Sequence, residues 1–302
     1  MILINFMENS QDDKIVISFL GTGRLGLLVA ESLLKNKYKV KIVKRKNSKT
    51  NLQSLIDLGA TTLELDYEKL DGLNQFIDDG CDVYIGNIYQ SELINKLIKN
   101  LQKIKKRINK FVFISGANSA AVSQAHGNLE KFEDEILQQL QNTLIIKSTM
   151  IFGIKNDLNI ERITKALIKY PFFPIIGSGQ TLYQPIHYYD LSQTIVKAFN
   201  LKNNIGKKIM VGGKNTIQYI DLIKLIKKKI NSKSIVVKIP HKIAYIFLLI
   251  ISKVIRKKNI IEKIKTINVN RNVENKEAEK ILNHTPISLE DRLEDSIKEY
   301  FK

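Results

Sequence analysis

A glycine-rich turn between an apolar run and a helix-like segment constrains the fold of this chain more than any other feature. The apolar run over residues 14–20 predicts a buried strand, and the apolar spacing over residues 27–34 predicts a helix. Between them lies a G-x-G-x-x-G sequence, Gly21-Thr22-Gly23-Arg24-Leu25-Gly26. A strand that runs directly into such a turn, with a helix leaving it, is the context in which this sequence carries information.

Each glycine of the turn has a physical reason in that context. Gly21 would make the tight turn, Gly23 would let the backbone approach a pyrophosphate, and Gly26 would let the helix pack against the strand. The first N–H groups of the helix and its positive partial charge favour the same anion. A loop that needs only flexibility is the alternative. The turn therefore predicts a dinucleotide-binding site.

Strand-like and helix-like segments alternate through the first half of the chain. This pattern is typical of parallel strands joined by helical crossovers. The predicted strands cover residues 14–20, 38–43, 62–65, 82–85, 111–115 and 144–147, and the predicted helices cover residues 27–34, 52–58, 91–101 and 128–140. The sequence thus predicts an α/β fold with a doubly wound parallel sheet.

After Gly153 the alternation gives way to a different pattern. A helix is predicted around residues 158–169, a break at Pro171-Phe172-Phe173-Pro174, a returning sheet strand at residues 208–211, and a capping box at Ser288-Leu289-Glu290-Asp291 ahead of a final helix. We expect a dinucleotide-binding domain over residues 1–155, to which residues 184–213 return. We expect a smaller, mostly helical substrate-binding lobe from residues 156–183 and 214–302.

The charge of the chain is strongly positive, with 48 Lys and Arg against 30 Asp and Glu and a formal net charge of +18. Such a charge fits either an anionic partner or a lysine-rich compositional bias. The densest basic run, residues 103–110, lacks the interleaved aromatic residues of a base-stacking surface, so we expect no nucleic-acid partner. The single cysteine, Cys81, and four scattered histidines predict a reducing compartment and no structural metal.

Nothing in the sequence predicts export or a membrane span. The first residues lack a basic region followed by an apolar core, which favours a cytoplasmic protein. The nine apolar residues from Ile243 to Ile251 are too few to cross a bilayer. Because basic residues follow them, they are a candidate for peripheral contact with the inner face of a membrane. A core helix of the smaller lobe is the alternative.

The second predicted strand ends in a basic group, Lys44-Arg45-Lys46. An acidic residue there would bind the ribose 2′-hydroxyl of NAD, whereas a basic residue accommodates the 2′-phosphate of NADP. Since no carboxylate stands in that position and Arg45 can hold a phosphate with two hydrogen bonds, NADP is favoured over NAD. Lys44, Arg45 and Asp66, which follows the third predicted strand, complete the candidate cofactor-binding residues.

Several further segments carry a family resemblance. The strand over residues 111–115 ends in a serine, and residues 145–153 look like an R-P-x-x-x-[YF]-G segment. With residues 156–162, 172–177 and 184–191, they make the chain resemble the extended and atypical short-chain dehydrogenase/reductases. The most similar group is the NAD(P)-dependent epimerase/dehydratase group, which includes nucleoside-diphosphate-sugar epimerases. The resemblance spans nearly the whole chain, implies a Rossmann-type fold, and is greatest to a branch that makes cell-surface polysaccharides and O-antigens.

The resemblance implies a catalytic tyrosine and lysine at Y-x-x-x-K together with the serine that ends the strand. Ser115 matches that serine, and Lys131 matches the lysine that also binds the nicotinamide ribose. The residue four positions before Lys131 is Gly127, so the usual phenol is missing. Three interpretations stay open: His126 acts as the acid/base, a tyrosine from elsewhere such as Tyr84 or Tyr89 does so, or redox chemistry is lost.

The same resemblance places the substrate pocket in the lobe after Gly153. The residues expected near substrate are Asn159, Arg162, Gln184 and His187, with Arg162 a candidate partner for a diphosphate. Alternatively, Gln184-Pro185-Ile186-His187 only shapes the strand that returns to the sheet. The chain departs from the family at two places: Tyr183 stands where many relatives have arginine, and Lys147-Ser148 replaces Arg-Pro. The substrate of a particular family member is therefore not assigned to this chain.

The leading hypothesis from the sequence is an NAD(P)-binding epimerase, dehydratase or reductase. Its substrate would be a nucleotide-linked or polyprenyl-linked sugar of cell-surface polysaccharide synthesis. A non-catalytic NADP(H)-binding sensor or scaffold is the second hypothesis, because the tyrosine is missing. Homodimers are common in the family, and the sequence leaves the oligomeric state open.

Overall fold

The central sheet of the protein forms because short apolar runs pair side by side in parallel. The computed structural model describes residues 15–19, 21–66, 69, 73–86, 91–117, 127–201, 206–245 and 269–301. Seven strands form the sheet in the order β11-β6-β5-β4-β1-β2-β3, and every pair is parallel. Their bounds are β1 Ile15–Phe19, β2 Lys39–Arg45, β3 Thr61–Leu65, β4 Cys81–Ile85, β5 Ile108–Gly116, β6 Thr143–Ser148 and β11 Lys207–Val211.

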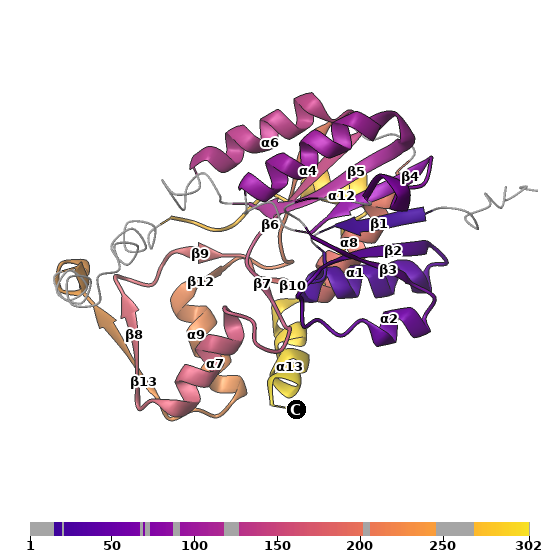
Figure 1. The fold of residues 1–302 in the computed structure, drawn as a ribbon. Helices are drawn as coiled ribbons and strands as arrows, with labels where there is room; N and C mark the ends of the chain where they lie inside the picture. The colour runs from indigo at the N-terminus through magenta and orange to yellow at the C-terminus, as the bar shows by residue number, and fades with distance from the viewer. Residues whose placement is uncertain are drawn as a thin grey trace, which may run out of the picture.

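Helices cover both faces of this sheet (Figure 1). One face is packed by α3 (Leu73–Phe76), α4 (Ser91–Ile104) and α6 (Gly127–Gln139), around a core that includes Phe111, Phe113 and Ile145. The other face is packed by α1 (Arg24–Lys35), α2 (Gln53–Asp57), α8 (Tyr188–Phe199) and α12 (Lys276–Leu282). The doubly wound α/β prediction is confirmed, and the strand predicted at residues 208–211 lies at one edge of the sheet.

The strand order reverses between β1 and β4, since the chain winds outward from β1 to β3 and then returns to β4 on the other side of β1. Such a reversal leaves a crevice at the carboxyl ends of the two strands, where ligands of doubly wound sheets bind. The glycine-rich turn follows β1 directly at this point. The topology therefore places the turn at the position that a dinucleotide site requires.

A separate apolar cluster holds those elements after β7 (Ile151–Phe152) that do not pack on the large sheet. It packs α7 (Ile160–Lys169), α9 (Tyr219–Lys229) and α13 (Leu289–Tyr300) against β8 (Phe172–Ile176) and β13 (Ile235–Ile239), which are parallel to each other. Two further short pairs, β7 with β10 (Ile186–His187) and β9 (Leu182–Tyr183) with β12 (Ile217–Gln218), lie between this cluster and the sheet. Figure 1 shows the cluster below and to the left of the large sheet.

The helix α7 ends at Lys169, before the break predicted at Pro171–Pro174, but the break is not irregular, because β8 runs through Pro174. Proline lacks the N–H that a ladder needs, and it is tolerated in a strand with a free edge. Among the described residues β8 pairs with β13 alone, so Pro174 interrupts no ladder that the described strands make at the other edge of β8. The predicted cap at the start of α13 is present: the Ser288 side chain accepts a hydrogen bond from the backbone N–H of Asp291, and the Ser288 hydroxyl lies 2.6 Å from the Asp291 carboxylate.

No helix among the described residues is both long and apolar enough to cross a bilayer. Of the segment from Ile243 to Ile251, only residues 243–245 are described, at the end of a helical stretch over residues 241–245; the rest lies outside the described residues.

Candidate functional site

The glycine-rich turn has the shape that its sequence predicts. A Cβ atom on Gly26 would lie 1.3 Å from the backbone oxygen of Gly21, so no side chain fits there. A Cβ atom on Gly23 would meet nothing within 4 Å, and Gly23 is exposed. Gly21 is buried, and Thr22, Arg24 and Leu25 complete the turn, with Arg24 exposed. The turn therefore leaves open space above Gly23 and closes tightly at Gly26.

The start of α1 is suited to an anion. Gly23 is its N-cap residue, no side chain caps the helix, and no acidic residue lies in its first turn. The first N–H groups of the helix therefore face the open space with their positive partial charge uncompensated by a carboxylate of that turn. These features fit the diphosphate of a dinucleotide, whose backbone approach Gly23 permits.

The basic end of β2 lies beside an acidic residue of β3. Lys44 is paired in register with Glu64, and its Nζ lies 2.8 Å from the Glu64 carboxylate. The positive charge of Lys44 is thus partly neutralised, while Arg45 at the strand end is exposed. Asp66 follows β3 and is also exposed. The sequence analysis missed Glu64, although its place in the third predicted strand was the available signal.

Ser115 lies at the carboxyl end of β5, where its hydroxyl is engaged inside the protein. It donates a hydrogen bond of 2.5 Å to Oε1 of Glu133 on α6. The other carboxylate oxygen of Glu133 lies 2.7 Å from Nζ of Lys147 on β6 and 3.3 Å from Nζ of Lys208 on β11. Ser115, Glu133 and Lys147 are each at most 2% exposed. We call Ser115, Glu133, Lys147 and Lys208 the Glu133 cluster.

Lys131 does not join the Glu133 cluster. It is exposed on α6, whereas Glu133, roughly 200° further around the helix, is buried against the sheet. The structure therefore brings Glu133, rather than Lys131, to the serine.

Of the three candidate replacements for the missing phenol, the structure describes Tyr84. Tyr84 on β4 is fully buried in the apolar core, its hydroxyl has no hydrogen-bond partner among the described residues, and burial raises its pKa. Such a phenol is poorly placed to exchange a proton with a ligand. His126 and Tyr89 lie outside the described residues.

The four residues expected near substrate do not form one open cluster. Arg162 is exposed on α7, and the Asn159 side chain donates to the backbone oxygen of Ile151 at 2.8 Å. Gln184 is buried, and its amide is used at both ends, donating to Gly213 and accepting from the backbone N–H of Val273.

His187, the fourth of these residues, is buried where the chain enters α8. Its Nδ1 accepts from the backbone N–H of Tyr189 at 3.4 Å, and its ring contacts Phe152 and Tyr188. A Cβ atom on Gly153 would lie 2.3 Å from this ring, which explains a glycine there. Burial, helped by the positive charge of Arg292, lowers the pKa of His187 to about 4. The imidazole is therefore neutral at neutral pH.

Acid should destabilise the protein through His187. A histidine in the unfolded chain has a pKa near 6.5, whereas the folded-state pKa of His187 is about 4. The neutral imidazole therefore contributes its full stability above pH 6.5, and this contribution is lost as the pH falls toward about 4. We expect the free energy of unfolding to fall by about 2 kcal/mol more between pH 6.5 and 5 in the wild type than in His187→Asn. Asparagine retains a capping side chain without the titration. Urea unfolding at both pH values measures this, and equal pH dependence of the two proteins would contradict it.

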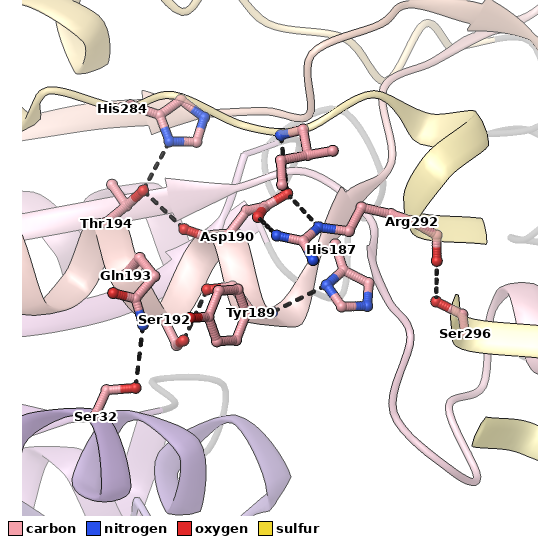
Figure 2. Close-up of polar contacts among 11 residues, drawn as sticks. Ser32, His187, Tyr189, Asp190, Ser192, Gln193, Thr194, His284, Arg292 and Ser296 are labelled. Atoms are coloured by element: carbon pink, nitrogen blue, oxygen red, sulfur yellow. Dashed lines mark hydrogen bonds and ion pairs between the residues drawn. The ribbon is translucent and has the colours of Figure 1, made fainter. Parts of the chain in front are cut away.

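A polar network ties α8 to the C-terminal segment (Figure 2). Asp190 in the first turn of α8 accepts two hydrogen bonds from the guanidinium of Arg292 on α13 and one from the backbone N–H of Ile287. Thr194 lies 2.7 Å from Nδ1 of buried His284, whose Nε2 lies 2.8 Å from the backbone oxygen of Gly212. Sequence analysis missed this network because its partners are 72 to 102 residues apart.

A second cluster that the sequence analysis missed surrounds Tyr183. The guanidinium carbon of Arg271 lies 5.2 Å from the centre of the Tyr183 ring, and the centre of the Tyr219 ring lies 5.1 Å from the same centre. Tyr183 and Arg271 also form an isolated β-bridge. Position 183 has a tyrosine instead of an arginine, and the guanidinium of Arg271 lies beside that tyrosine. Their separation in sequence gave no local signal.

Among the described residues no group of three or more His, Cys, Asp or Glu side chains could hold a metal ion. Cys81 is buried in the core, and burial raises the pKa of its thiol to about 12.

Solved structures of similar fold extend over almost the whole chain. A UDP-glucuronic acid 4-epimerase from Bacillus cereus, solved with UDP-glucuronic acid and NAD, is 19% identical with a TM-score of 0.71, covering 95% of this chain and 99% of that one. A nucleoside-diphosphate-sugar epimerase from Pseudomonas aeruginosa is 13% identical with a TM-score of 0.72, covering 96% and 97%. The chain has the fold of the nucleotide-sugar epimerases.

An ADP-L-glycero-D-manno-heptose-6-epimerase from Helicobacter pylori shares the epimerase fold over 98% of this chain and 97% of its own, with 13% identity and a TM-score of 0.69. No protein-family model matches the chain. A curated relative, the mitochondrial NADH dehydrogenase (ubiquinone) 1 alpha subcomplex subunit 9 of Arabidopsis thaliana, is 26% identical over 113 residues. That match spans 37% of this chain and 28% of the relative.

Proposed function

We propose that this chain binds a nicotinamide dinucleotide at the turn over residues 21–26 and acts as an NAD(P)-dependent epimerase-like or reductase-like enzyme on a nucleotide-linked sugar. The observation that carries the proposal is the turn itself, closed at Gly26, open above Gly23 and placed at the reversal of strand order. The UDP-sugar and NAD bound to the Bacillus cereus epimerase of the same fold support it.

The residues of this chain have separate tasks in the proposal. The N–H groups at the start of α1 hold the diphosphate, and Gly23 keeps the approach open. When bound, a nicotinamide supplies a hydride acceptor and donor for a sugar carbon. His126 is the proposed proton acceptor for the sugar hydroxyl, because the phenol is missing and Tyr84 is buried. Arg162, exposed on α7, is the proposed partner of the substrate diphosphate.

The preferred dinucleotide is proposed to be NADP. Arg45 is exposed at the end of β2, where a 2′-phosphate would lie, and Lys44 is already paired with Glu64. We expect Arg45→Ala to weaken NADPH binding by about tenfold or more, since a hydrogen bond to a charged group contributes about 1.5–3 kcal/mol. NADH binding should be unchanged, and Lys46→Ala is the matched control. Equal losses for both nucleotides in calorimetry would count against a phosphate contact at Arg45.

The finer parts of the proposal concern the sugar carrier and the location. We propose a role in cell-surface polysaccharide synthesis and a polyprenyl-linked substrate. We also propose that the segment from Ile243 to Ile251 makes a peripheral contact with the inner face of a membrane. The apolar character of that segment and the basic residues after it support this part. A two-domain division at residues 155 and 156 and a homodimer remain part of the same proposal.

A second candidate function is a non-catalytic dinucleotide-binding protein. Two observations favour it: Gly127 stands in the position of the usual tyrosine, and the Ser115 hydroxyl is engaged by a buried carboxylate. The partial match to a subunit of the NADH dehydrogenase (ubiquinone) 1 alpha subcomplex supports the same interpretation.

Turnover distinguishes the two functions. The purified protein is incubated with NAD or NADP and with UDP-glucose or UDP-glucuronic acid, and products are separated by chromatography while nicotinamide absorbance is followed. The enzyme proposal expects an epimer or a change in cofactor redox state, lost in His126→Ala. Dinucleotide binding without turnover on these or other nucleotide sugars would establish the non-catalytic alternative instead.

A further inference from the structure

One face of the two-stranded sheet β8–β13 is apolar and open to solvent. Phe172 is paired in register with Ile235, and Pro174 with Val237. Successive side chains of a strand point to opposite faces, so these four residues share one face. Phe172 is 59% exposed and Ile235 56%, whereas Phe173 and Ile175, on the other face, are buried against the lobe. We call Phe172, Pro174, Ile235 and Val237 the β8–β13 face.

Further apolar side chains adjoin this face. The exposed Ile168 and Tyr170 precede β8 on the chain, and Ile243 and Tyr245 follow β13. His241 packs against Gly177, where a Cβ atom would lie 2.2 Å from its Nε2, so the stretch over residues 241–245 lies beside the end of β8. Half of the large exposed hydrophobic side chains of the described residues thus belong to these two segments. Figure 1 shows β8 and β13 at the end of the lobe away from the large sheet.

The charge of these segments is predominantly positive. Residues 162–180 and 222–245 contain ten Lys and Arg residues and no Asp or Glu, and three of the ten, Lys165, Lys224 and Lys229, pair with Glu161, Asp221 and Glu294 outside these ranges. Lys169, whose Nζ lies 5.3 Å from the centre of the Tyr170 ring, and Lys242 are both exposed. Exposed apolar side chains grouped on one surface mark an interaction site, and the basic residues around them favour an anionic partner. A second copy of this chain would instead bring two strongly positive surfaces together.

We propose that the β8–β13 face docks on an anionic lipid surface. Phe172, Ile235 and Val237 would enter the boundary between headgroups and acyl chains, while Lys169 and Lys242 contact the headgroups. A nucleic acid would use the lysines and leave the aliphatic face in water. The lipid surface uses both features of the patch, and the proposal is independent of dinucleotide binding.

Vesicle flotation tests the proposal with the full chain. The wild type should float with vesicles of phosphatidylcholine and phosphatidylglycerol and should not float with phosphatidylcholine alone. The double variant Phe172→Ser/Ile235→Ser should lower the partition coefficient by about tenfold or more, because two inserted apolar side chains are lost. Lys169→Glu/Lys242→Glu should lower it by a similar factor, and added salt should weaken binding of the wild type.

Leu158→Ser is the matched control, since Leu158 is 81% exposed and lies outside the β8–β13 face. It should float like the wild type, and all variants should keep the wild-type melting temperature because the changed residues are exposed. Absence of wild-type binding to anionic vesicles would overturn the proposal. Unchanged flotation of Phe172→Ser/Ile235→Ser would also overturn it, as would self-association of the wild type that this variant abolishes.

Discussion

Replacing Glu133 with alanine is expected to lower the free energy of unfolding by about 3–5 kcal/mol, because it leaves the buried ammonium of Lys147 without its carboxylate partner. The Ser115 hydroxyl loses its acceptor in the same variant. Urea unfolding followed by circular dichroism measures the loss. A change below about 1 kcal/mol would show that the Glu133 cluster does not hold α6 to the ends of β5 and β6.

Two variants separate the buried pair from general effects on α6. Asp134→Ala removes the neighbouring carboxylate, which lies 2.7 Å from Lys208 but is 56% exposed, so it should cost less than about 1 kcal/mol. Glu133→Met/Lys147→Met replaces the pair with apolar side chains and should be more stable than Glu133→Ala. If the double variant is the less stable of the two, the uncompensated charge is not the cause of the loss.

Placing a carboxylate in the glycine-rich turn is expected to abolish dinucleotide binding. A Cβ atom on Gly23 meets nothing within 4 Å, so Gly23→Asp should fold normally. Its charge would lie where the diphosphate is proposed to bind, and like charges placed together cost several kcal/mol. We expect NADPH to bind at least about 100-fold more weakly, measured by calorimetry.

Gly23→Ala is the companion variant, since it fills the same space without charge. It should weaken binding less than Gly23→Asp does. A melting temperature equal to that of the wild type shows that both variants are folded. Wild-type affinity in Gly23→Asp would move the proposed site away from the turn.

The large sheet could be predicted from the sequence because its information is local. Most of its strands are short, mainly apolar runs, and Gly26 must be glycine for a contact with Gly21 only five residues away. The burial of Glu133 could also be predicted from the helical spacing of its apolar neighbours. Leu129, Phe132 and Ile136 are buried on α6 at helical spacing, and Glu133 falls on the same face. A carboxylate on the buried face of a helix predicts a buried partner. The other charged residues of α6 are typical of a solvated helix and hide this signal.

The smaller lobe could not be predicted in the same way. Asp190 meets Arg292, Thr194 meets His284, and Tyr183 meets Arg271 across about 90 to 100 residues of chain, so no periodicity records these contacts. At Pro174 a local signal was present but misleading. Proline ends most strands, yet it is tolerated in β8, which pairs with β13 alone among the described strands. The preference for NADP and the roles of Ser115, Lys131 and His126 remain predictions.

Titration of the wild-type protein with NADPH and NADH in a calorimeter tests the central claim most directly. The account predicts binding of one dinucleotide per chain, with NADPH tighter than NADH. Absence of heat or saturation with either nucleotide would contradict it, and the fold would then serve a purpose other than dinucleotide chemistry.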